Sequence, residues 1–398
     1  MPYNTTHMSL LRLFGGIVAA IILVIAISVG IGEEPAAPTI STEAPVISLN
    51  DTEPPPAGAS GEEPEEKPEE EGGAESSVPV SPEPEHAAPG LPQETPPAVS
   101  GTIPSVTEDA ESMPVSFSAV NEAARRALVN ILCTTKSGGA LRPISGSGVL
   151  IDPRGVILTN THIAQYYLLE NYQVPGFLSC AIRTGSPARP QYRATALFIH
   201  PEWIRENADN IVSDNPTGTG ENDFALLLID RPVSGAVTLP DAFPYVKADT
   251  QLRSVGVSES LLLAAYPAGF IGNISVERNL YLASSIAEVV ELFTFGRDTL
   301  DLFSLGGSVV AQKGSSGGAA VNDKGELVGL IVTSTDAETT GGRDLHAISL
   351  EHVDRSLQAH AGETLSVFLS GDLAERARVF NTRTAPALTE LLVAELDR

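Results

Sequence analysis

A run of small residues followed by a hairpin pattern constrains the fold of this chain most. The run Lys313–Gly318 reads Lys-Gly-Ser-Ser-Gly-Gly, which on composition alone fits a flexible linker. It leads directly, however, into the apolar segment Ala319–Val321, a turn at Asn322–Gly325 and the apolar strand Glu326–Val332. Because a linker does not run straight into core strands, we expect a tight turn inside a β-rich domain, in which glycine permits a sharp bend.

Two segments upstream carry side chains that would activate a serine in this turn. The segments Ser145–Asp152 and Gly155–Thr161 predict a hairpin that ends at His162. Further along, Asp223 stands immediately before an apolar strand. A serine nucleophile needs a base, and the base needs an acid that orients it. The chain order histidine, aspartate, serine is that of the chymotrypsin type and differs from the orders of subtilisin and the α/β-hydrolases.

Together these segments resemble the trypsin-like superfamily, and most closely its HtrA (Deg) branch. The motifs are Gly-Ser-Gly-Val-Leu-Ile-Asp-Pro-Arg-Gly before the histidine, Asn-Asp-Phe-Ala-Leu-Leu around the aspartate and Gly-Ser-Ser-Gly-Gly at the serine. The resemblance runs from about Ser116 to Leu357, since Ser116–Val120 and Val129–Ile131 resemble the family's first helix and first strand. It implies an all-β fold with a double six-stranded β-barrel.

The resemblance also implies roles for particular residues. His162 would be the general base, Asp223 would orient its imidazole, and Ser316 would attack the substrate carbonyl. The backbone N–H groups of Gly314 and Ser316 would form the oxyanion hole. Each residue alone fits a plain turn or strand-end role, so the prediction rests on all of them in order.

The function implied is that of a serine endopeptidase that acts on protein or peptide substrates. The HtrA branch adds an expectation of protein quality control, and no metal or other cofactor is implied. The alternative is a protease-fold binding or chaperone protein whose oxyanion loop rests in an inactive state. A serine-directed covalent probe would separate the two.

The chain departs from the family pattern at two places. Ser315 stands where trypsin-type zymogens carry an aspartate, and a serine cannot pair with a freed N-terminal ammonium. Activation by N-terminal cleavage is therefore not expected. The stretch between His162 and Asp223 is enlarged by polar, turn-rich segments at 207–210 and 216–220, which predict an inserted surface loop near the active-site rim.

Specificity can be bounded by the same resemblance. In this superfamily the residue six places before the nucleophile lies at the base of the primary pocket, and here it is Val310. No carboxylate is present there to bind lysine or arginine, so a pocket for small aliphatic side chains is implied. His200 precedes a proline, as a structural histidine does in the family, and we do not assign it to catalysis.

Cys133 and Cys180 both fall in the predicted first barrel. A disulfide between them would suit an oxidising compartment. Two buried free thiols would also pack well as small hydrophobes. The sequence leaves both possibilities open.

Most of the negative charge lies near the N-terminus. The formal net charge is −26, and about 19 acids against one lysine, or roughly −18, fall between Glu33 and Glu111 together with most of the prolines. Residues 32–114 therefore predict a disordered linker with a root-mean-square span of about 50 Å. The remainder has no basic patch, which disfavours nucleic-acid binding.

Residues 13–31 form an uncharged, largely apolar run that is long enough to cross a membrane as a helix. Because Arg12 precedes the run and Glu33 follows it, residues 1–12 are expected to be cytoplasmic. The chain would then be a single-pass protein of the cell membrane with an extracytoplasmic protease domain. The alternative is a cleaved signal peptide, for which Ala26–Ser28 is a passable site.

The predicted protease domain covers residues 115–361 and closes with a helix from about Glu351 to Ala361. Residues 362–398 predict a helical tail with Leu388 and Leu392 on one helical face. This tail is too short for the PDZ domain that most HtrA proteases carry, so regulation through such a domain is not expected. We expect the tail to pack on the barrel, and the alternative is that it mediates assembly into a homo-oligomer.

Overall fold

The computed structural model describes residues 40–41, 47–48, 116–136, 141–213, 217–268, 276, 279–296, 298–332 and 342–398. These ranges all belong to one structural unit. The expected membrane segment 13–31 and nearly all of the expected linker 32–114 lie outside the described residues. Within the described ranges, no helix is both long and apolar enough to cross a membrane.

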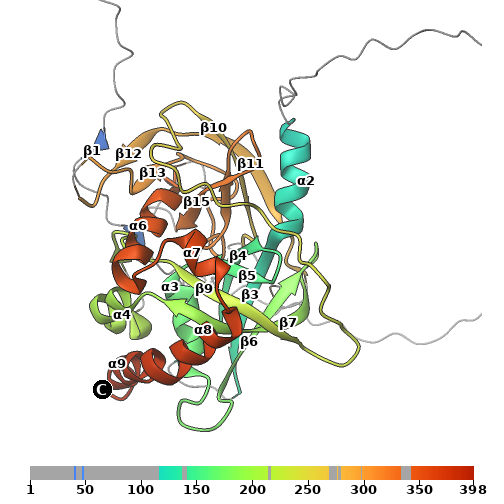
Figure 1. The fold of residues 1–398 in the computed structure, drawn as a ribbon, viewed down its shortest axis with the longest axis vertical. Helices are drawn as coiled ribbons and strands as arrows, with labels where there is room; N and C mark the ends of the chain where they lie inside the picture. Colours follow the sequence, from blue (N-terminus) through green and yellow to red (C-terminus); the bar gives the residue numbers. More distant parts are fainter. Residues whose placement is uncertain are drawn as a thin grey trace, which may run out of the picture. The chain divides into compact units, whose positions relative to one another are not determined.

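A closed barrel of six antiparallel strands forms the first half of the fold (Figure 1). In order around the barrel, the strands are β3 (Leu128–Thr135), β4 (Ile144–Asp152), β5 (Val156–Thr159), β9 (Ala225–Pro232), β7 (Arg189–Ile199) and β6 (Leu178–Thr184). Their β-branched and leucine side chains, such as Ile131, Ile157 and Leu226, are fully buried in the core. The first of the two expected six-stranded barrels is therefore confirmed.

The second half is an eight-stranded sheet and differs from the expected six-stranded barrel. In order across the sheet, its strands are β1 (Ile40–Ser41), β12 (Glu291–Phe293), β13 (Leu302–Ser304), β16 (His346–Ser349), β15 (Leu327–Val332), β14 (Ala319–Val321), β10 (Ser260–Ala265) and β11 (Ala283–Glu288). The turn after Ser316 therefore leads into the hairpin β14–β15, as the sequence predicted.

The sheet is nevertheless barrel-like because one stretch of chain joins its end strand β11 to β12, the strand next to its other end. Strands β11 and β12 are separated only by Val289 and Val290. The N–H of Val289 donates to the carbonyl of Glu259, next to β10, whereas the N–H of Val290 donates to the carbonyl of Ser304 in β13. The chain thus changes partners between two adjacent residues, and this corner takes the place of a further pairing between strands.

Helix α2 (Phe117–Ala127) precedes β3, as the resemblance predicted. Its N-cap, Ser116, accepts a hydrogen bond from the N–H of Ala119 at 3.4 Å. Val120, Ala124 and Ala127 recur at helical spacing and are buried against the second sheet.

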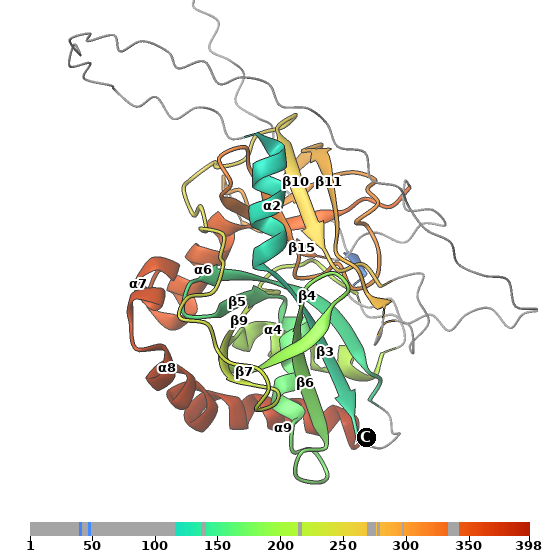
Figure 2. The ribbon, with the colours of Figure 1, turned by 90° about the vertical axis from the view of Figure 1, so that its right-hand side faces the viewer.

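The C-terminal helices curve around the first barrel (Figure 2). They are α6 (Leu350–Ala361), α7 (Leu365–Ser370), α8 (Leu373–Val379), the π-helical turn η3 (Phe380–Thr384) and α9 (Ala385–Leu396). A proline in the first turn of α9, Pro386, lacks an N–H and would crowd the carbonyl four residues earlier, which accounts for the widened turn before it. The tail packs on the first half of the fold, as expected. Helix α8 and η3 contact β7, and α9 packs on helical segments that connect the barrel strands, where Leu388 and Leu392 are buried.

The inserted segment is more ordered than the expected surface loop. It forms α4 (Pro201–Asn207), the 3₁₀ turn η2 (Ala208–Val212) and the short strand β8 (Thr217–Gly218). Helix α9 packs on both α4 and η2. The turn-rich sequence did not reveal this packing, because α9 lies almost 200 positions further along the chain.

Two short strands from the N-terminal segment pair with strands of the main folded unit. Strand β1 runs parallel to β12, and β2 (Ile47–Ser48) runs antiparallel to β8. Both strands fall inside the range 32–114 that was expected to be a linker. At these positions the chain is part of the folded unit.

The sulfur atoms of Cys133 and Cys180 form a disulfide with an S–S distance of 2.00 Å. The two residues lie directly opposite each other on β3 and β6. Of the two possibilities left open by the sequence, the structure has the bridge.

Candidate active site

His162 and Asp223 meet through two hydrogen bonds. Nδ1 of His162 lies 2.7 Å from Oδ2 of Asp223, and the backbone N–H of His162 donates to Oδ1 at 2.9 Å. His162 lies in the short helix α3 (Thr161–Ala164), which follows β5 after one intervening residue, and Asp223 is two residues before the start of β9. His162 is 5% exposed and Asp223 is fully buried.

The residues beside this pair hold the two segments together. The side-chain amide of Asn160 donates to the carbonyl of Asp223 at 2.8 Å, and the hydroxyl of Thr161 donates to the carbonyl of Phe224 at 2.7 Å. Asn222 adopts a left-handed backbone conformation, with φ of 62°, that turns the chain into Asp223. The carboxylate position is thus determined by backbone contacts on both sides.

The contact selects one tautomer of the imidazole. A carboxylate accepts hydrogen bonds, so Nδ1 of His162 carries the hydrogen toward Asp223. The lone pair is then on Nε2, which is the nitrogen a general base needs. This pair can therefore accept a proton from a nucleophile placed at Nε2.

The loop around Ser316 follows the first barrel closely. Ser316 is 5% exposed, and its carbonyl accepts a hydrogen bond from the N–H of Ser147 at 2.8 Å. Gly317 has φ of +83°, and a Cβ there would lie 2.0 Å from the carbonyl oxygen of Ser147. Only glycine fits this position, because both the conformation and the close approach exclude a side chain.

Gly314, the other expected oxyanion residue, is equally confined. Its φ is +86°, and a Cβ there would lie 2.8 Å from the carbonyl oxygen of Tyr266. The carbonyl of Lys313 accepts a hydrogen bond from the N–H of Ala268 at 2.5 Å. Since the C=O and N–H of a trans peptide point in opposite directions, the N–H of Gly314 points away from Ala268.

Ser147 is a site residue that the sequence analysis missed. Its backbone N–H contacts Ser316, and its carbonyl accepts a hydrogen bond from the hydroxyl of Thr159, three residues before His162, at 2.8 Å. The signal was present in the two flanking glycines, Gly146 and Gly148. Glycine inside a strand often marks a close approach of another segment.

Ser315 and Val310 contact each other beneath the loop. The hydroxyl of Ser315 donates to the carbonyl of Val310 at 2.5 Å. Val310 is fully buried in the core of the second sheet, whereas its neighbour Val309 is 59% exposed. The assignment of Val310 to a specificity pocket stays a prediction.

His200 lies between β7 and α4 and has hydrogen-bond partners of its own. Its Nε2 lies 3.0 Å from the hydroxyl of Ser356, and its Nδ1 accepts the N–H of Trp203 at 3.5 Å as the cap of α4. Burial lowers the pKa of His200 to about 3, with a further contribution from the nearby His360. These contacts agree with the structural role expected for it.

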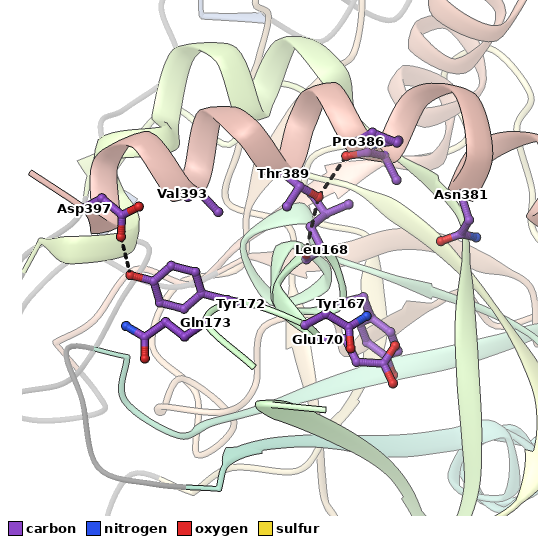
Figure 3. Close-up of a pocket in the computed structure, with 12 residues that line it drawn as sticks. Tyr167, Leu168, Glu170, Tyr172, Gln173, Asn381, Pro386, Thr389, Val393 and Asp397 are labelled. Carbon is purple, nitrogen blue, oxygen red and sulfur yellow. Dashed lines mark hydrogen bonds between the residues drawn. The ribbon is translucent and has the colours of Figure 1, made fainter. Parts of the chain in front are cut away.

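A cleft of about 600 Å³ lies away from this site, between η1 (Gln165–Leu169) and α9 (Figure 3). On one side, the hydroxyl of Tyr172 donates to the carboxylate of Asp397 at 2.8 Å. On the other, the hydroxyl of Thr389 donates to the carbonyl of Leu168 at 3.1 Å. The residues that line the cleft include none of His162, Asp223 and Ser316.

A family model matches the part of the chain that contains the site. Residues 146–330 match the model of the trypsin-like peptidase domain, a range that contains His162, Asp223 and Ser316. No curated protein sequence matches the chain.

Among solved structures, the chain is similar to the Rv3671c protease of M. tuberculosis in two forms. The active form has 15% identity and a TM-score of 0.38, covering 66% of this chain and 96% of that one. An inactive mutant from strain H37Rv has 14% identity and a TM-score of 0.37, covering 61% and 90%. Both TM-scores are too low to compare individual residues. On the family match, this chain carries a trypsin-like peptidase domain at residues 146–330 and is a serine endopeptidase.

Proposed function

We propose that the chain cleaves peptide bonds with His162, Asp223 and Ser316 as a catalytic triad. The proton of the Ser316 hydroxyl would pass to Nε2 of His162 as the oxygen attacks the substrate carbonyl carbon. The negative charge on the carbonyl oxygen would be stabilised by the N–H groups of Gly314 and Ser316. His162 would then return the proton to the leaving amine, and water would hydrolyse the acyl-enzyme by the same route.

The observation that carries this proposal is the two-point contact between His162 and Asp223. It sets both the tautomer and the orientation of the imidazole. Ser147 supports the assignment of Ser316, because its backbone contacts both the strand that leads to His162 and the loop of Ser316. The HtrA branch, and with it a role in protein quality control, rests on sequence resemblance alone.

The decisive experiment is covalent labelling with a fluorophosphonate probe. We expect the full-length protein to be labelled rapidly and stoichiometrically at Ser316, and Ser316→Ala to abolish both labelling and peptide cleavage. Thermal unfolding of Ser316→Ala should stay close to that of the wild type, because the hydroxyl is not a packing group. Peptide cleavage near the wild-type level in this variant would show that the nucleophile is another residue.

The same probe tests the binding or chaperone alternative. Labelling that begins only after a protein or peptide ligand is added would favour a resting, inactive oxyanion loop. Immediate labelling would favour a constitutive enzyme. The hydrogen bond between Ala268 and Lys313 supports the constitutive reading, because turning the peptide between Lys313 and Gly314 would break it.

We further propose that residues 13–31 anchor the enzyme in the cell membrane, with the peptidase domain outside the cytoplasm. The length and apolar character of the run support this, as does the charge on either side of it. An added external protease should digest the peptidase domain in intact cells. Protection of the domain until the cells are lysed would contradict the proposed topology.

A further inference from the structure

We propose that Ser147 is a positioning residue for the oxyanion hole, whose buried hydroxyl holds the backbone of Gly314 in its catalytic orientation. The inference rests on the proposed function, since it takes Gly314 and Ser316 as the oxyanion donors. It adds a residue from the first barrel to a loop that belongs to the second.

The hydroxyl of Ser147 has a defined donor and a defined acceptor direction. Ser147 is fully buried, and its Oγ lies 2.8 Å from the carbonyl oxygen of Gly314 and 2.9 Å from the backbone nitrogen of Tyr266. The N–H of Tyr266 can only donate, so the single hydroxyl hydrogen is directed to Gly314. The bond to Gly314 is therefore determined by the surrounding backbone.

The backbone of Ser147 cannot easily move away from the loop. Its N–H donates to the carbonyl of Ser316 at 2.8 Å, and its carbonyl accepts the hydroxyl of Thr159 at 2.8 Å. The side chain of Ser147 thus contacts Gly314, and its backbone contacts Ser316. These are the two residues whose N–H groups would bind the oxyanion.

Gly314 needs such support because glycine has wide conformational freedom. The peptide plane before it is held by the bond from Ala268 to the carbonyl of Lys313. The plane after it is held by Ser147 at its carbonyl and by the bond from the N–H of Ser315 to the carbonyl of Gln312 at 3.1 Å. If Ser147 lost its hydroxyl, the carbonyl of Gly314 would lose this buried partner, and the second plane would keep only the bond from the N–H of Ser315 to the carbonyl of Gln312. The N–H of Gly314 lies in the first plane, which has only the bond from Ala268, so movement of the second plane would let the glycine rotate and would weaken the preorganisation of this N–H toward the developing charge.

A neighbouring serine on the same strand provides a matched control. The hydroxyl of Ser145 accepts a hydrogen bond from the side chain of Asn130 at 3.0 Å, inside the first barrel. The change Ser145→Ala removes the same atom from β4 as Ser147→Ala does. It differs in that the hydrogen bond that is lost does not reach the Ser316 loop.

The test compares full-length wild type, Ser147→Ala and Ser145→Ala in two assays, fluorophosphonate labelling of Ser316 and turnover of a small peptide. We expect Ser147→Ala to lower the labelling rate and kcat by about 10- to 100-fold while KM changes by less than about twofold. A loss confined to kcat is the signature of transition-state stabilisation. Ser145→Ala should stay within about twofold of the wild type in both assays.

Thermal unfolding establishes that each variant is folded at the assay temperature. Should Ser147→Ala fail to fold, Ser147→Cys replaces it, since a thiol has nearly the same shape and is a weak donor. A folded variant at Ser147 that labels and turns over within about twofold of the wild type would overturn the inference, as would an equal loss in Ser145→Ala. If the wild type is not labelled at Ser316, the proposed function fails and the inference falls with it.

Discussion

At the scale of single residues, Asp223 does more than pair with the imidazole. One of its oxygens accepts the backbone N–H of His162 and the other faces Nδ1. A backbone N–H can only donate, so any replacement must present an oxygen to it. This constraint determines which tautomer His162 would adopt beside an amide at position 223.

The change Asp223→Asn should therefore lower kcat by about 10⁴-fold with little effect on stability. The carbonyl oxygen of the new amide would accept the backbone N–H of His162, which leaves its NH₂ group facing Nδ1. Nδ1 would then become the acceptor and Nε2 would carry the hydrogen, so His162 could not take the proton of Ser316. Steady-state kinetics would check this, and a loss of less than about tenfold would mean that another acid orients His162.

His200 belongs to a chain of hydrogen bonds that ends next to Asp223. Because its Nδ1 accepts the N–H of Trp203, its hydrogen is on Nε2 and is donated to Ser356, which donates in turn to Oδ1 of Asn222 at 2.7 Å. Protonation would place a second donor opposite the N–H of Trp203. This agrees with a pKa lowered by burial to about 3.

The lowered pKa makes the protein sensitive to acid. Below about pH 6.5, the ordinary value for histidine, the unfolded chain takes up a proton at His200 and the folded chain does not. Stability is thus lost as the pH falls from about 6.5 toward 3. We expect the wild type to lose about 2 kcal/mol more than His200→Gln between pH 8 and pH 5, measured by denaturant unfolding. Equal losses in the two proteins would show that His200 titrates normally.

Site residues that stand in motifs of consecutive residues were predictable, whereas those that act through contacts with distant parts of the chain were not. His162, Asp223 and Ser316 stand in motifs of consecutive residues, and the structure brings His162 and Asp223 together as expected. Ser147 and Asn222 act through contacts more than 100 residues away, with Gly314 and Ser356. A single sequence does not record such pairs, apart from the flanking glycines of Ser147.

At the scale of elements, the C-terminal tail is part of the peptidase unit. Helix α9 packs on α4, η2 and η1, and η1 follows the helix that carries His162. Leu392 is fully buried in this contact, whereas its neighbour Leu391 is 38% exposed. The adjacent leucines therefore offer a direct test of whether the tail contributes to folding.

The change Leu392→Ala should destabilise the protein by about 2–4 kcal/mol, and Leu391→Ala by less than about 1 kcal/mol. The first change leaves a cavity beneath α9, and the second removes a side chain that is partly in water. The free energy of unfolding in denaturant is the quantity to measure. Equal effects of the two changes would mean that α9 does not pack on α4, η2 and η1 as described.

The elements themselves were predictable to different degrees. Apolar periodicity was enough for the strands of the first barrel, for the helix closing the domain and for the helical tail. The corner at Val289 and Val290 was not predictable. It exists because these two adjacent residues bond to different parts of the sheet, and those partners are distant in the sequence. Strands β1 and β2 are only two residues long each and leave no pattern in the sequence.

At the scale of the whole molecule, these two strands change the expected reach of the enzyme above the membrane. Only residues 32–39 separate the expected anchor at 13–31 from β1. Fully extended, this stretch spans about 30 Å. The acidic segment 49–115 stands in the sequence between β2 and α2, two elements of the peptidase unit. It would not then lengthen the tether, contrary to the expectation from composition.

A tether that ends at β1 can be distinguished by experiment from one that includes the acidic segment. In full-length protein reconstituted into vesicles, we would measure cleavage of peptides carried on spacers of increasing length above the bilayer. Deleting residues 62–94 should not change the range of spacer lengths at which peptides are cleaved, because β1 and β2 keep their partners. The turnover of a small soluble peptide should also stay unchanged.

Replacing Ile40 and Ile47 together by proline removes two backbone N–H groups and should release both strands without altering the length of the chain. The tether would then comprise residues 32–115, with a root-mean-square span of about 50 Å, and peptides on longer spacers should become substrates. A shorter range after the deletion alone would show instead that the acidic segment itself carries the enzyme away from the membrane.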